Sequence, residues 1–530
     1  IKYIIWALFL AVNALAQGPS STLHTDRPYY FSGEYLFYSF CNSKLPADSV
    51  IARVELYSND QEVDSYFINM VSQCGQGYFK LPFDLPTDNY NLSIYLYDET
   101  DFLPHKLIDG KISIFNDADI NRLKAEPGNN HHPPNESKIN NDTVVTLLSR
   151  RQSGKITINL PVTKEKINRI SVSVRDHILY ASPEGTLQNA DIDSVPTNPL
   201  NSIPFSGVRK VIDPGPIRNP LLFTFDPTNL SFVGSKVNAD EHFNLELKPF
   251  YGSKPLSFLD YVGNEIQINQ SQKVQRASIE REIRIDSSAL DHLRVYHQEK
   301  QINRLFKQLN VTPELSAIAS IIKEGKPSSY IDVQDYTIRG TTVDLFKEIT
   351  TNLKFRSSGA GNFNAKMIYE FNGITKFYSR SPLFIVNGRA TRDGNFIAKL
   401  PLQEIAFITI YSDYEFLEHL SPMAHGGIVF VDMLDPNYVL PDQYALPSIR
   451  IQGIQPPIEY PLHPTFFDDK PAIGSLLFWS PNVPIDDDSI TIELMSGDII
   501  SEYLVEVVVY LKDGESKIIR RKIATTTNVN

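Results

Sequence analysis

The sequence is poor in several features that would narrow its function at once. Among 530 residues only Cys41 and Cys74 are cysteines, and 50 Lys and Arg stand against 62 Asp and Glu. The net charge of −12 opposes binding to a polyanion, because nucleic-acid affinity depends on Lys and Arg displacing counterions from phosphates. After the first residues, no apolar segment reaches the roughly 20 residues of a transmembrane helix. We therefore expect no nucleic-acid partner and no transmembrane segment after signal cleavage.

Catalytic signatures are missing as well. The sequence contains no H-E-x-x-H, G-x-S-x-G or C-x-x-C motif. The glycine clusters at 359–361 and 426–427 are not followed by the Lys-Ser/Thr pair of a phosphate-binding loop. Geometry rather than chain order defines a Ser-His-Asp triad, so the sequence leaves an assembled triad open. We expect a protein that is not an enzyme and has no cofactor.

Three groups of residues have the elements of a metal site without the right spacing. His131-His132 lie in a Pro/Asn-rich stretch with no carboxylate or thiol at ligand spacing. His292, His297 and Glu299 fall on different faces of a predicted helix, so we expect surface side chains. Asp486-Asp-Asp488 lacks the alternating acids of a calcium loop and predicts a solvated turn. No metal site is expected.

The N-terminus predicts export. Lys2 precedes a short apolar stretch at 3–12, and Ala14-Leu-Ala16 has the form of a cleavage site, so residues 1–16 are expected to be a signal peptide. A retained membrane anchor is the alternative, although the stretch is short for one. Gln17 stands where a lipoprotein needs Cys. We expect a periplasmic or outer-membrane-associated protein, with the cell surface as an alternative, that is not a lipoprotein.

Cys41 and Cys74 form an even pair inside one predicted domain. In an oxidising compartment such a pair indicates a disulfide, which would stabilise the fold by about 3 kcal/mol through restriction of the unfolded chain. The alternative is two separate buried thiols, because a bond requires Cα atoms within about 7 Å. The sequence leaves both open.

Runs of β-branched and aromatic residues predict strands along most of the chain. The predicted strands lie at 35–40, 52–57, 91–97, 155–160, 169–174, 221–225, 243–247, 265–268, 475–479, 489–494 and 503–510. Two stretches lack this pattern: residues 119–143 predict a linker, and residues 182–220 a long irregular excursion.

Helical spacing of apolar residues is confined to two stretches. It predicts a helix at 287–310 and a shorter one at 342–353, where Thr341 and Asp344 form a capping pair. Residues 381–388 predict a buried strand that ends in an Asn-Gly turn, followed by strands at 407–411 and 426–431. We expect a small mixed domain there.

Aromatic residues are abundant, with 26 Tyr and 30 Phe. Most are expected to fill sandwich cores. The run at 28–31, and Tyr95 with Tyr97, are predicted to leave a face exposed, since interfaces favour aromatics with little charge. We therefore expect one substantial protein–protein interface.

Three stretches resemble parts of known families. T-D-R-P-Y-Y-F-S-G-E at 25–34, with G-Q-G-Y-F-K-L-P at 75–82, is similar to a macroglobulin MG2 domain. P-L-F-I-V-N-G at 382–388, with L-P-L-Q-E-I at 400–405 and G-G-I-V-F-V at 426–431, resembles the plug domain of TonB-dependent receptors. L-L-F-W-S-P-N at 476–482 looks like the opening of a terminal β domain.

In this order, the three matches resemble large exported proteins of the Bacteroidota. The resemblance implies the periplasm or outer membrane and company with β-barrel assemblies, and it implies no enzyme. Two departures limit it. Too few residues follow the plug-like segment to build a receptor barrel. Cys74-Gly-Gln-Gly77 imitates the macroglobulin thioester motif, but Gly77 replaces the acyl-donating Gln, so no thioester can form there.

The expected fold is mainly β: tandem macroglobulin/Ig-like β-sandwich domains with a short helical section and a small α+β plug-like domain. The predicted order is signal peptide 1–16, MG2-like sandwich 17–118, linker 119–143, β-sandwich region 144–285, helical section 286–355, plug-like domain 356–435 and C-terminal β domain 436–530. The expected function is a non-enzymatic scaffold or accessory subunit of an outer-membrane-associated complex that contacts a β-barrel protein engaged in transport, secretion or barrel insertion. A surface glycan-binding or glycan-processing protein is the alternative.

Overall fold

Strand is the dominant element of the computed structural model, as the sequence predicts. The structure describes residues 21–46, 48–58, 61–120, 123, 147–177, 187–189, 196, 198–210, 221–226, 231–260, 267–270, 276, 283, 287–306, 326–337, 340–420, 424, 426–457 and 471–526. The predicted signal peptide, nearly all of the predicted linker and His131-His132 lie outside these residues. The chain divides into two compact units, 1–202 with 274–315 and 454–530, and 203–273 with 316–453.

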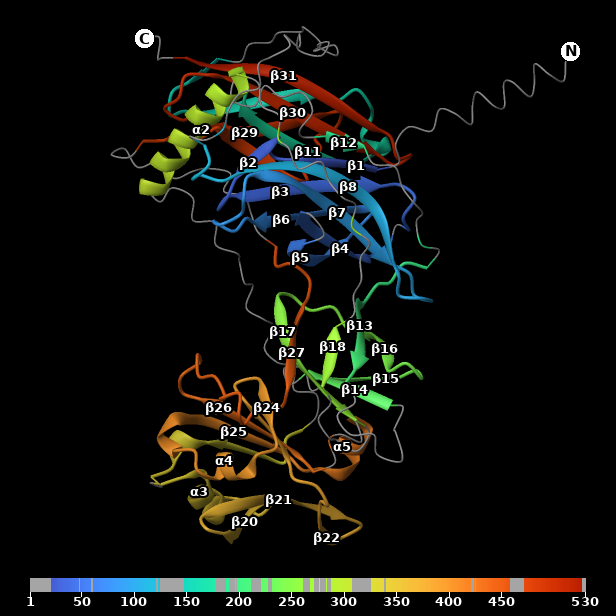
Figure 1. Cartoon of the computed structure of the whole chain (residues 1–530), viewed down its shortest axis with the longest axis vertical. Helices are drawn as coiled ribbons and strands as arrows, with labels where there is room; N and C mark the ends of the chain where they lie inside the picture. The colour runs from blue at the N-terminus through green and yellow to red at the C-terminus, as the bar shows by residue number, and fades with distance from the viewer. Residues whose placement is uncertain are drawn as a thin grey trace, which may run out of the picture. The chain divides into compact units, whose positions relative to one another are not determined.

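An N-terminal sandwich opens the first unit (Figure 1). Its four-stranded sheet has the order β12-β1-β3-β6, with β1 Ser21–Thr25, β3 Tyr35–Asn42, β6 Cys74–Lys80 and β12 Leu187–Asn189. Its five-stranded sheet has the order β2-β8-β7-β4-β5, with β2 Tyr29–Phe31, β4 Val50–Ser58, β5 Gln61–Met70, β7 Asp88–Tyr97 and β8 Pro104–Phe115. One apolar cluster, which includes Leu36, Tyr38 and Leu92, is buried between the sheets.

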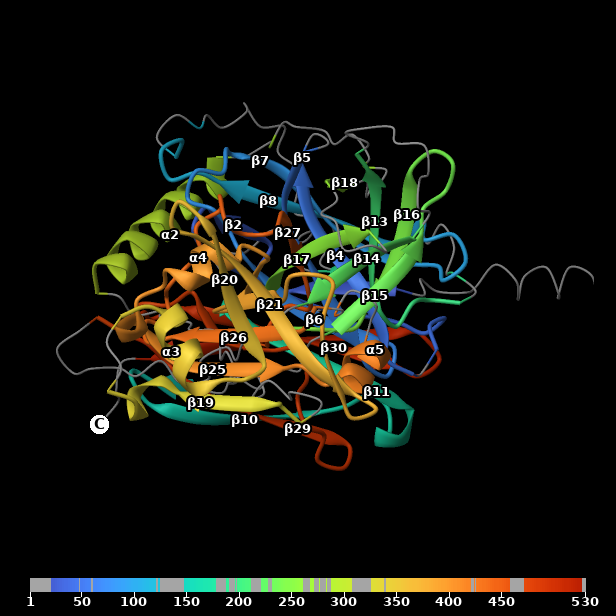
Figure 2. The ribbon, with the colours of Figure 1, turned by 90° about the horizontal axis from the view of Figure 1, so that it is seen from below.

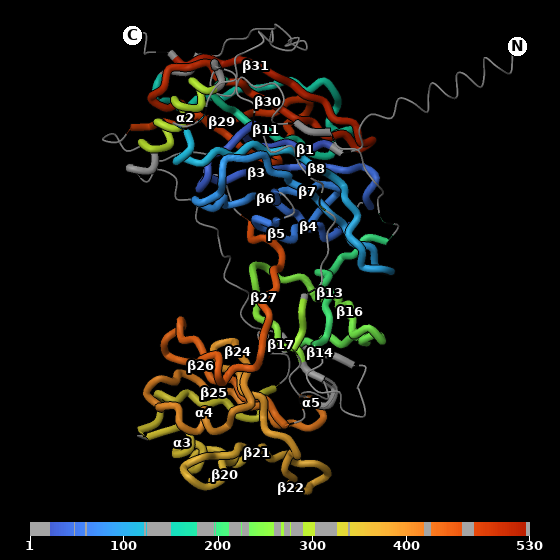
Figure 3. The backbone as a smooth tube through the Cα atoms, viewed as in Figure 1, coloured from blue at the N-terminus to red at the C-terminus, as the bar shows by residue number. Residues whose placement is uncertain are grey.

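The second sandwich combines two distant stretches of the chain. The earlier stretch contributes β9 Leu147–Ser149, β10 Ser153–Asn159, the 3-10 turn η1 Lys164–Lys166 and β11 Ile167–Asp176. The later stretch contributes β28 Leu476–Ser480, β29 Ser489–Met495, β30 Glu502–Leu511 and β31 Ser516–Thr526. The sheets are β10-β29 and β28-β11-β30-β31-β9. In Figure 3 the red tube of β30 and β31 accordingly runs beside that of β11.

This pairing corrects two predicted domain boundaries. The region 144–285 and the C-terminal domain 436–530 were expected to be separate domains, but β11 pairs with both β28 and β30, so parts of each region form one sandwich. Alternating patterns predict that a segment is a strand. They do not specify its partner, since register and partner depend on burial in the assembled fold.

Helix α2, Ser287–Phe306, packs on the N-terminal sandwich. Its Leu290, Leu293 and Tyr296 form one buried cluster with Phe31 and Phe115. The helix therefore covers the aromatic run at 28–31, which we expected to be partly exposed. Within that run only Tyr29 is partly exposed, whereas Tyr30 and Phe31 are 0% exposed. Tyr95 and Tyr97 are only 2% and 3% exposed, so for them the expectation was wrong.

The second unit contains a third pair of sheets. The order β16-β13-β18 joins β16 His242–Leu247, β13 Ile203–Arg209 and β18 Ile268–Gln270, and the order β15-β14-β17-β27 joins β15 Ser231–Lys236, β14 Leu221–Asp226, β17 Ser253–Asp260 and β27 Ser448–Gln452. The rings of Phe205, Phe243 and Phe258 pack together, with centroids 5.4–6.1 Å apart. The expected irregular excursion at 182–220 thus contains two strands, β12 and β13.

A mixed α+β domain completes the second unit. Its main sheet has the order β19-β25-β26-β23-β24, with β19 Ser329–Asp332, β23 Leu383–Val386, β24 Arg389–Thr391, β25 Ile405–Tyr411 and β26 Ile428–Met433. A second sheet contains β20 Leu353–Gly359, β21 Asn362–Phe371 and β22 Ile374–Phe377. Short helices complete it: η2 Val333–Asp335, α3 Thr342–Ile349, α4 Gly394–Ala398, η3 Leu402–Glu404 and α5 Tyr414–Leu420. Figure 2 shows α3 and α4 beside β20 and β21.

In this domain the predicted helix cap and turn are present, whereas the domain boundaries differ from the predicted ones. The N–H of Thr341 bonds Oδ2 of Asp344 at 3.0 Å, which confirms the predicted capping pair. Asn387 and Gly388 have φ of 42° and 81°, as the predicted Asn-Gly turn requires. The core, however, extends from Ile331 to Leu446, so β19, α3 and the start of β20 belong here rather than to a separate helical section at 286–355.

Candidate functional site

The two sandwiches of the first unit meet in a buried polar contact, here called the sandwich joint. It consists of His24 on β1, Ser171, Ser173 and Arg175 on β11, and Glu506 on β30. Alternation along the strands creates it: on β11 Ile170, Val172 and Val174 face the core of the second sandwich, and the residues between them face the other way. Both faces of β11 and β30 are therefore buried.

Short polar contacts connect the members of the joint. Nδ1 of His24 lies 2.6 Å from Oγ of Ser171, and Nε2 of His24 lies 3.6 Å from Oε1 of Glu506. Arg175 donates from Nη1 to Oε1 of Glu506 at 3.1 Å and to Oγ of Ser173 at 2.8 Å. A serine, a histidine and a carboxylate thus converge in space, although the sequence carries no motif for them.

Opposite charges and burial set the protonation of the joint. Burial lowers the pKa of His24 and outweighs the neighbouring Glu506 carboxylate, so the ring is neutral at pH 7. Burial alone would raise the pKa of Glu506, but Arg175, His24 and Arg520 together hold that pKa well below its usual value. Arg520 on β31 donates from Nε to Oε2 of Glu506 at 2.6 Å. Glu506 is therefore a carboxylate held between two guanidinium groups.

The arrangement has the groups of a catalytic triad but no access for a substrate. His24, Ser171 and Glu506 are each 0% exposed, and the ring of Trp479 packs on His24 with centroids 5.0 Å apart. A hydrolytic triad needs a nucleophile and an oxyanion site that a substrate can reach. These residues instead form hydrogen bonds and ion pairs with one another across the contact between the sandwiches. Such pairing is required because a buried charge is tolerated only when it is paired and hydrogen-bonded.

A disulfide adjoins the joint. Cys41 on β3 and Cys74 on β6 are directly opposite each other, with Cα atoms 4.1 Å apart, and the structure bonds their sulfur atoms. Val508 and Tyr510 of the second sandwich pack on the pair. Of the two alternatives that the sequence left open, the structure has the disulfide.

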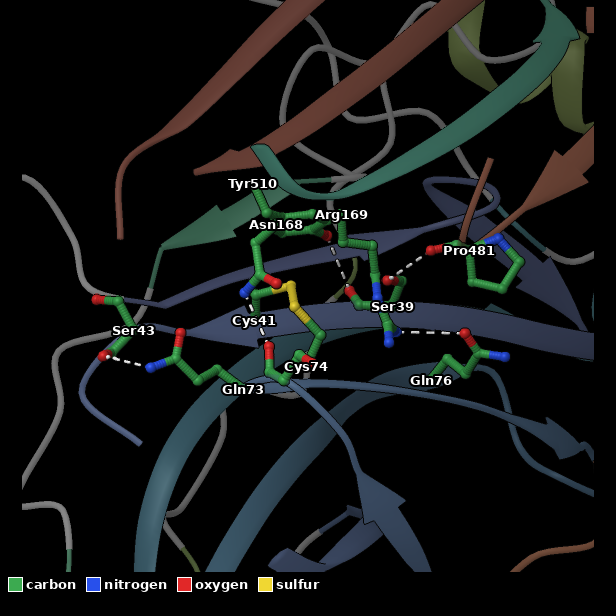
Figure 4. The surroundings of a disulfide bond; sticks show 11 residues. Ser39, Cys41, Ser43, Gln73, Cys74, Gln76, Asn168, Arg169, Pro481 and Tyr510 are labelled. Atoms are coloured by element: carbon green, nitrogen blue, oxygen red, sulfur yellow. Dashed lines mark hydrogen bonds between the residues drawn. A yellow bond between two sulfur atoms is a disulfide. The ribbon is translucent and has the colours of Figure 1, made fainter. Parts of the chain in front are cut away.

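Hydrogen bonds surround the disulfide and connect the two sandwiches (Figure 4). Tyr510 donates from its hydroxyl to the carbonyl oxygen of Ser39 at 3.2 Å, and Asn168 donates from Nδ2 to that of Ser72 at 2.8 Å. Arg169 donates from Nη1 to Oε1 of Gln76 at 3.3 Å. The disulfide links two strands of the N-terminal sandwich, and the apolar contact and these hydrogen bonds hold the second sandwich against it.

Residues of the MG2-like motif hold helix α2. The Tyr296 hydroxyl of α2 accepts from Nη1 of Arg27 and donates to Oε1 of Glu34. Lys300 donates from Nζ to the carbonyl oxygen of Ser32 at 2.6 Å and to Oδ1 of Asp117 at 2.7 Å. The motif at 25–34 thus fixes structure and presents no open site.

Glu299 on α2 is a buried acid that differs from Glu506 in its surroundings. We expected a surface side chain, but it is 8% exposed, and its Oε2 has no hydrogen-bond partner among the described residues. Burial, with the charge of Asp176 beside it, raises the pKa of Glu299 to about 8. The carboxyl is therefore mostly protonated at neutral pH.

The other residues examined as ligands do not converge. Asp486–Asp488 are exposed in the turn that begins β29, and His292 and His297 are half-buried on α2. No group of three or more His, Cys, Asp or Glu suited to a metal ion occurs among the described residues. In the same part of the chain, no helix has the length and apolar character needed to cross a membrane.

Sequence inspection missed the members of the joint, although one signal was present. The run 503–510 is apolar on both faces apart from Glu506, and 169–174 is followed directly by Arg175. A charge in the middle of a strand buried on both faces needs a partner, so these two residues were candidates for a pair. His24 and Ser171 carry no such mark.

Comparison with known proteins gives weak similarities. No family model matches the chain, and no curated protein matches it in sequence. Among solved structures, it is similar to Escherichia coli alpha-2-macroglobulin activated by porcine elastase (TM-score 0.25, 9% identity, 96% of this chain and 44% of that chain) and to the native conformation of the same protein (TM-score 0.24, 8% identity, 97% and 40%).

A further similarity is to dimeric latent PorU from Porphyromonas gingivalis (TM-score 0.15, 7% identity, 96% of this chain and 34% of that chain). The chain spans less than half the length of each of these solved structures. Similarity at these scores carries no argument about function. The assignment of a mainly β fold with several sandwiches is therefore made from the strand pairing of the chain itself.

Proposed function

We propose that this protein is a non-enzymatic scaffold or accessory subunit of a complex in the bacterial cell envelope. In this proposal it is exported to the periplasm or the outer membrane and works by contact with a β-barrel protein of the outer membrane. The plug-like and MG2-like resemblances suggest this setting. Its mixed domain is the part that we compare with a receptor plug.

The observation that carries the proposal is the sealed state of the sandwich joint. The convergent Ser-His-Glu set that occurs among the described residues is 0% exposed at all three residues and links two domains. Where a serine hydrolase has a cleft, this unit has a domain contact. The serine, histidine and glutamate hold two domains together, and this use supports a role in which the protein presents surfaces to other proteins.

Two features support export. The residues at 2–16 have the pattern of a signal peptide. The disulfide between Cys41 and Cys74 suits an oxidising compartment, because reducing conditions in the cytosol keep thiols free.

Cross-linking in the envelope of the producing bacterium tests the proposal. An affinity tag placed after residue 526 allows purification of the cross-linked protein, and mass spectrometry identifies its partners. We expect an outer-membrane β-barrel protein among the cross-linked adducts. A control strain exports an unrelated passenger protein with the same N-terminal signal and the same affinity tag. Proteins recovered from that strain bind the resin or the tag and are excluded.

Two outcomes would contradict the proposal. Recovery of a monomer that is retained on polysaccharide columns would favour the glycan-binding alternative. Turnover of an ester, peptide or glycoside substrate that survives removal of contaminating enzymes would show a catalytic site.

A further inference from the structure

The second sheet of the mixed domain has an open edge. Within the part of the chain that the structure describes, β22 pairs with β21 and with no other strand. Tyr378 donates its N–H to the carbonyl oxygen of Met367 at 3.0 Å, immediately beyond the paired residues. In an antiparallel pair, hydrogen-bonded and non-bonded positions alternate. The backbone groups of Ile374 and Lys376 therefore point to β21, and those of Thr375 and Phe377 point to the open edge.

Apolar side chains are exposed along this edge. Phe371, Ile374 and Phe377 are 36%, 58% and 48% exposed, and all four residues of β22 are exposed. A tight turn at Asn372 and Gly373, with φ of 51° and 72°, holds the two strands in register. Exposed apolar residues are ordinary when scattered, but a group of them on one strand edge indicates a contact site.

The edge is held rigidly by the domain behind it. Met367 of β21 is 0% exposed in the core, and Tyr369 stacks on Tyr414 of α5 with ring centroids 5.1 Å apart. Tyr378 packs against Tyr369 with centroids 4.3 Å apart. Pairing with an added strand would then require little ordering of β22, and a preordered surface loses less entropy on binding.

The charge of this sheet is opposite to that of the whole chain. Residues 353–377 carry four cations against one acid, for a local charge of +3, whereas the chain carries −12. The cations and the acid are Lys354, Arg356, Lys366, Lys376 and Glu370. The guanidinium of Arg356 lies 4.7 Å from the ring centroid of Phe377, and Nζ of Lys376 lies 5.4 Å from that of Phe371. Positive charge and apolar surface are thus interleaved on both faces of the edge.

We infer that β22 is a docking edge for an extended acidic segment of a partner protein, which adds as a fourth strand. The outward backbone groups of Thr375 and Phe377 supply main-chain hydrogen bonds, and the sheet faces select acidic and apolar side chains. A second copy of this chain would place β22 against β22, and like charges opposite each other destabilise a strand pair. This inference depends on the proposed scaffold function and names one contact surface of it.

A synthetic peptide in which Glu and Val alternate is the probe. Fluorescence anisotropy of the labelled peptide with the full chain should show saturable binding, and a peptide in which Lys and Val alternate should bind at least about tenfold more weakly.

Thr375→Pro should weaken binding of the acidic peptide by about tenfold or more, because it removes an outward N–H without breaking a bond to β21. Arg356→Glu combined with Lys376→Glu should weaken it similarly. Ile500→Ser, at an equally exposed residue of the other unit, should leave it unchanged.

Three results would overturn the inference. The first is that the wild type and both folded variants bind the acidic peptide equally well. The second is that the protein self-associates, that Thr375→Pro abolishes this self-association, and that the peptide does not bind. The third is that anionic lipid vesicles bind as well as the peptide. Circular dichroism verifies that each variant is folded, and the charge-reversal variant tests the inference if the proline variant does not fold.

If cross-linking in the envelope yields no barrel protein but the peptide binds as expected, the proposed function fails and the docking edge stands. If a barrel protein is cross-linked equally well to Thr375→Pro, the docking edge fails and the function stands.

Discussion

The sandwich joint and the β20–β22 sheet invert the usual distribution of polar and apolar side chains. In the joint, a histidine, two serines and an ion pair are buried, and each of these five residues is at most 3% exposed. In the sheet, Phe371, Ile374 and Phe377 are exposed. Polar groups that are buried must find fixed partners, so they specify one arrangement of two domains. Apolar groups that remain exposed along a strand edge are where we propose that another molecule docks. The buried polar contact and the proposed docking edge thus belong to different units.

The largest effect is expected from removing the charge at the centre of the joint. Glu506→Gln leaves Arg175 and Arg520 without their carboxylate, and breaking one side of a buried pair costs about 3–5 kcal/mol of unfolding free energy. Denaturant unfolding followed by Trp479 fluorescence measures it, because Trp479 packs on His24. Glu493→Gln is the matched control, since its pair with Lys155 is solvent-exposed and should contribute less than about 1 kcal/mol. Equal effects of the two variants would remove the distinction between joint and surface.

The next effect concerns the disulfide beside the joint. Cys41→Ala combined with Cys74→Ala should lower the unfolding free energy by about 3 kcal/mol, because the closed loop no longer restricts the unfolded chain. The same measurement on the wild type with reductant should give a similar loss, and reductant should not affect the double variant. A loss from reductant in the double variant would contradict a role of this bond.

A pH-dependent effect is expected from Glu299, a buried acid whose Oε2 has no hydrogen-bond partner among the described residues. Its pKa is about 8 in the folded protein and 4.5 when unfolded, so the folded state binds more protons between these values. Stability should therefore be highest below about pH 4.5 as far as this group is concerned and fall as pH rises towards 8. Glu299→Gln should remove that dependence and stabilise the protein at about pH 9, where the folded wild type must hold a buried, ionised carboxylate. A wild-type profile that rises from pH 5 to 9 relative to the variant would contradict this account.

The smallest effect on stability is expected at the open edge. Ile374→Ser should change the unfolding free energy by less than about 0.5 kcal/mol, because the side chain is 58% exposed. Met367→Ser, on the same face of the same sheet but 0% exposed, should cost about 2–5 kcal/mol. Urea unfolding of both variants gives the comparison. A large loss from Ile374→Ser would mean that the edge is part of the core and not a contact surface.

Local patterns predicted many of the strands, both main helices and the Asn-Gly turn, because those features depend on neighbours in the sequence. They gave no strand at 61–70, 104–115, 353–377 or 516–526, where β5, β8, β20–β22 and β31 lie. The partners of β11 could not be predicted, since β28 and β30 follow it by some 300 residues and any alternating strand would fit the pattern equally well. We expected exposed aromatics at 28–31, where α2 covers Phe31, whereas Phe371 and Phe377 are among the aromatics that are exposed. A sequence shows that Phe371 and Phe31 are both apolar, but only the packed fold shows which one remains uncovered.

Photo-cross-linking in the producing cells tests most directly whether the apolar edge, and not a concealed reactive site, is the working part. A photoreactive amino acid is placed at Ile374, or at Ile500 as the exposed control in the other unit. We predict discrete adducts with an outer-membrane β-barrel protein from position 374 and none from position 500. No adduct from position 374, or the same adducts in equal yield from both positions, would contradict the account.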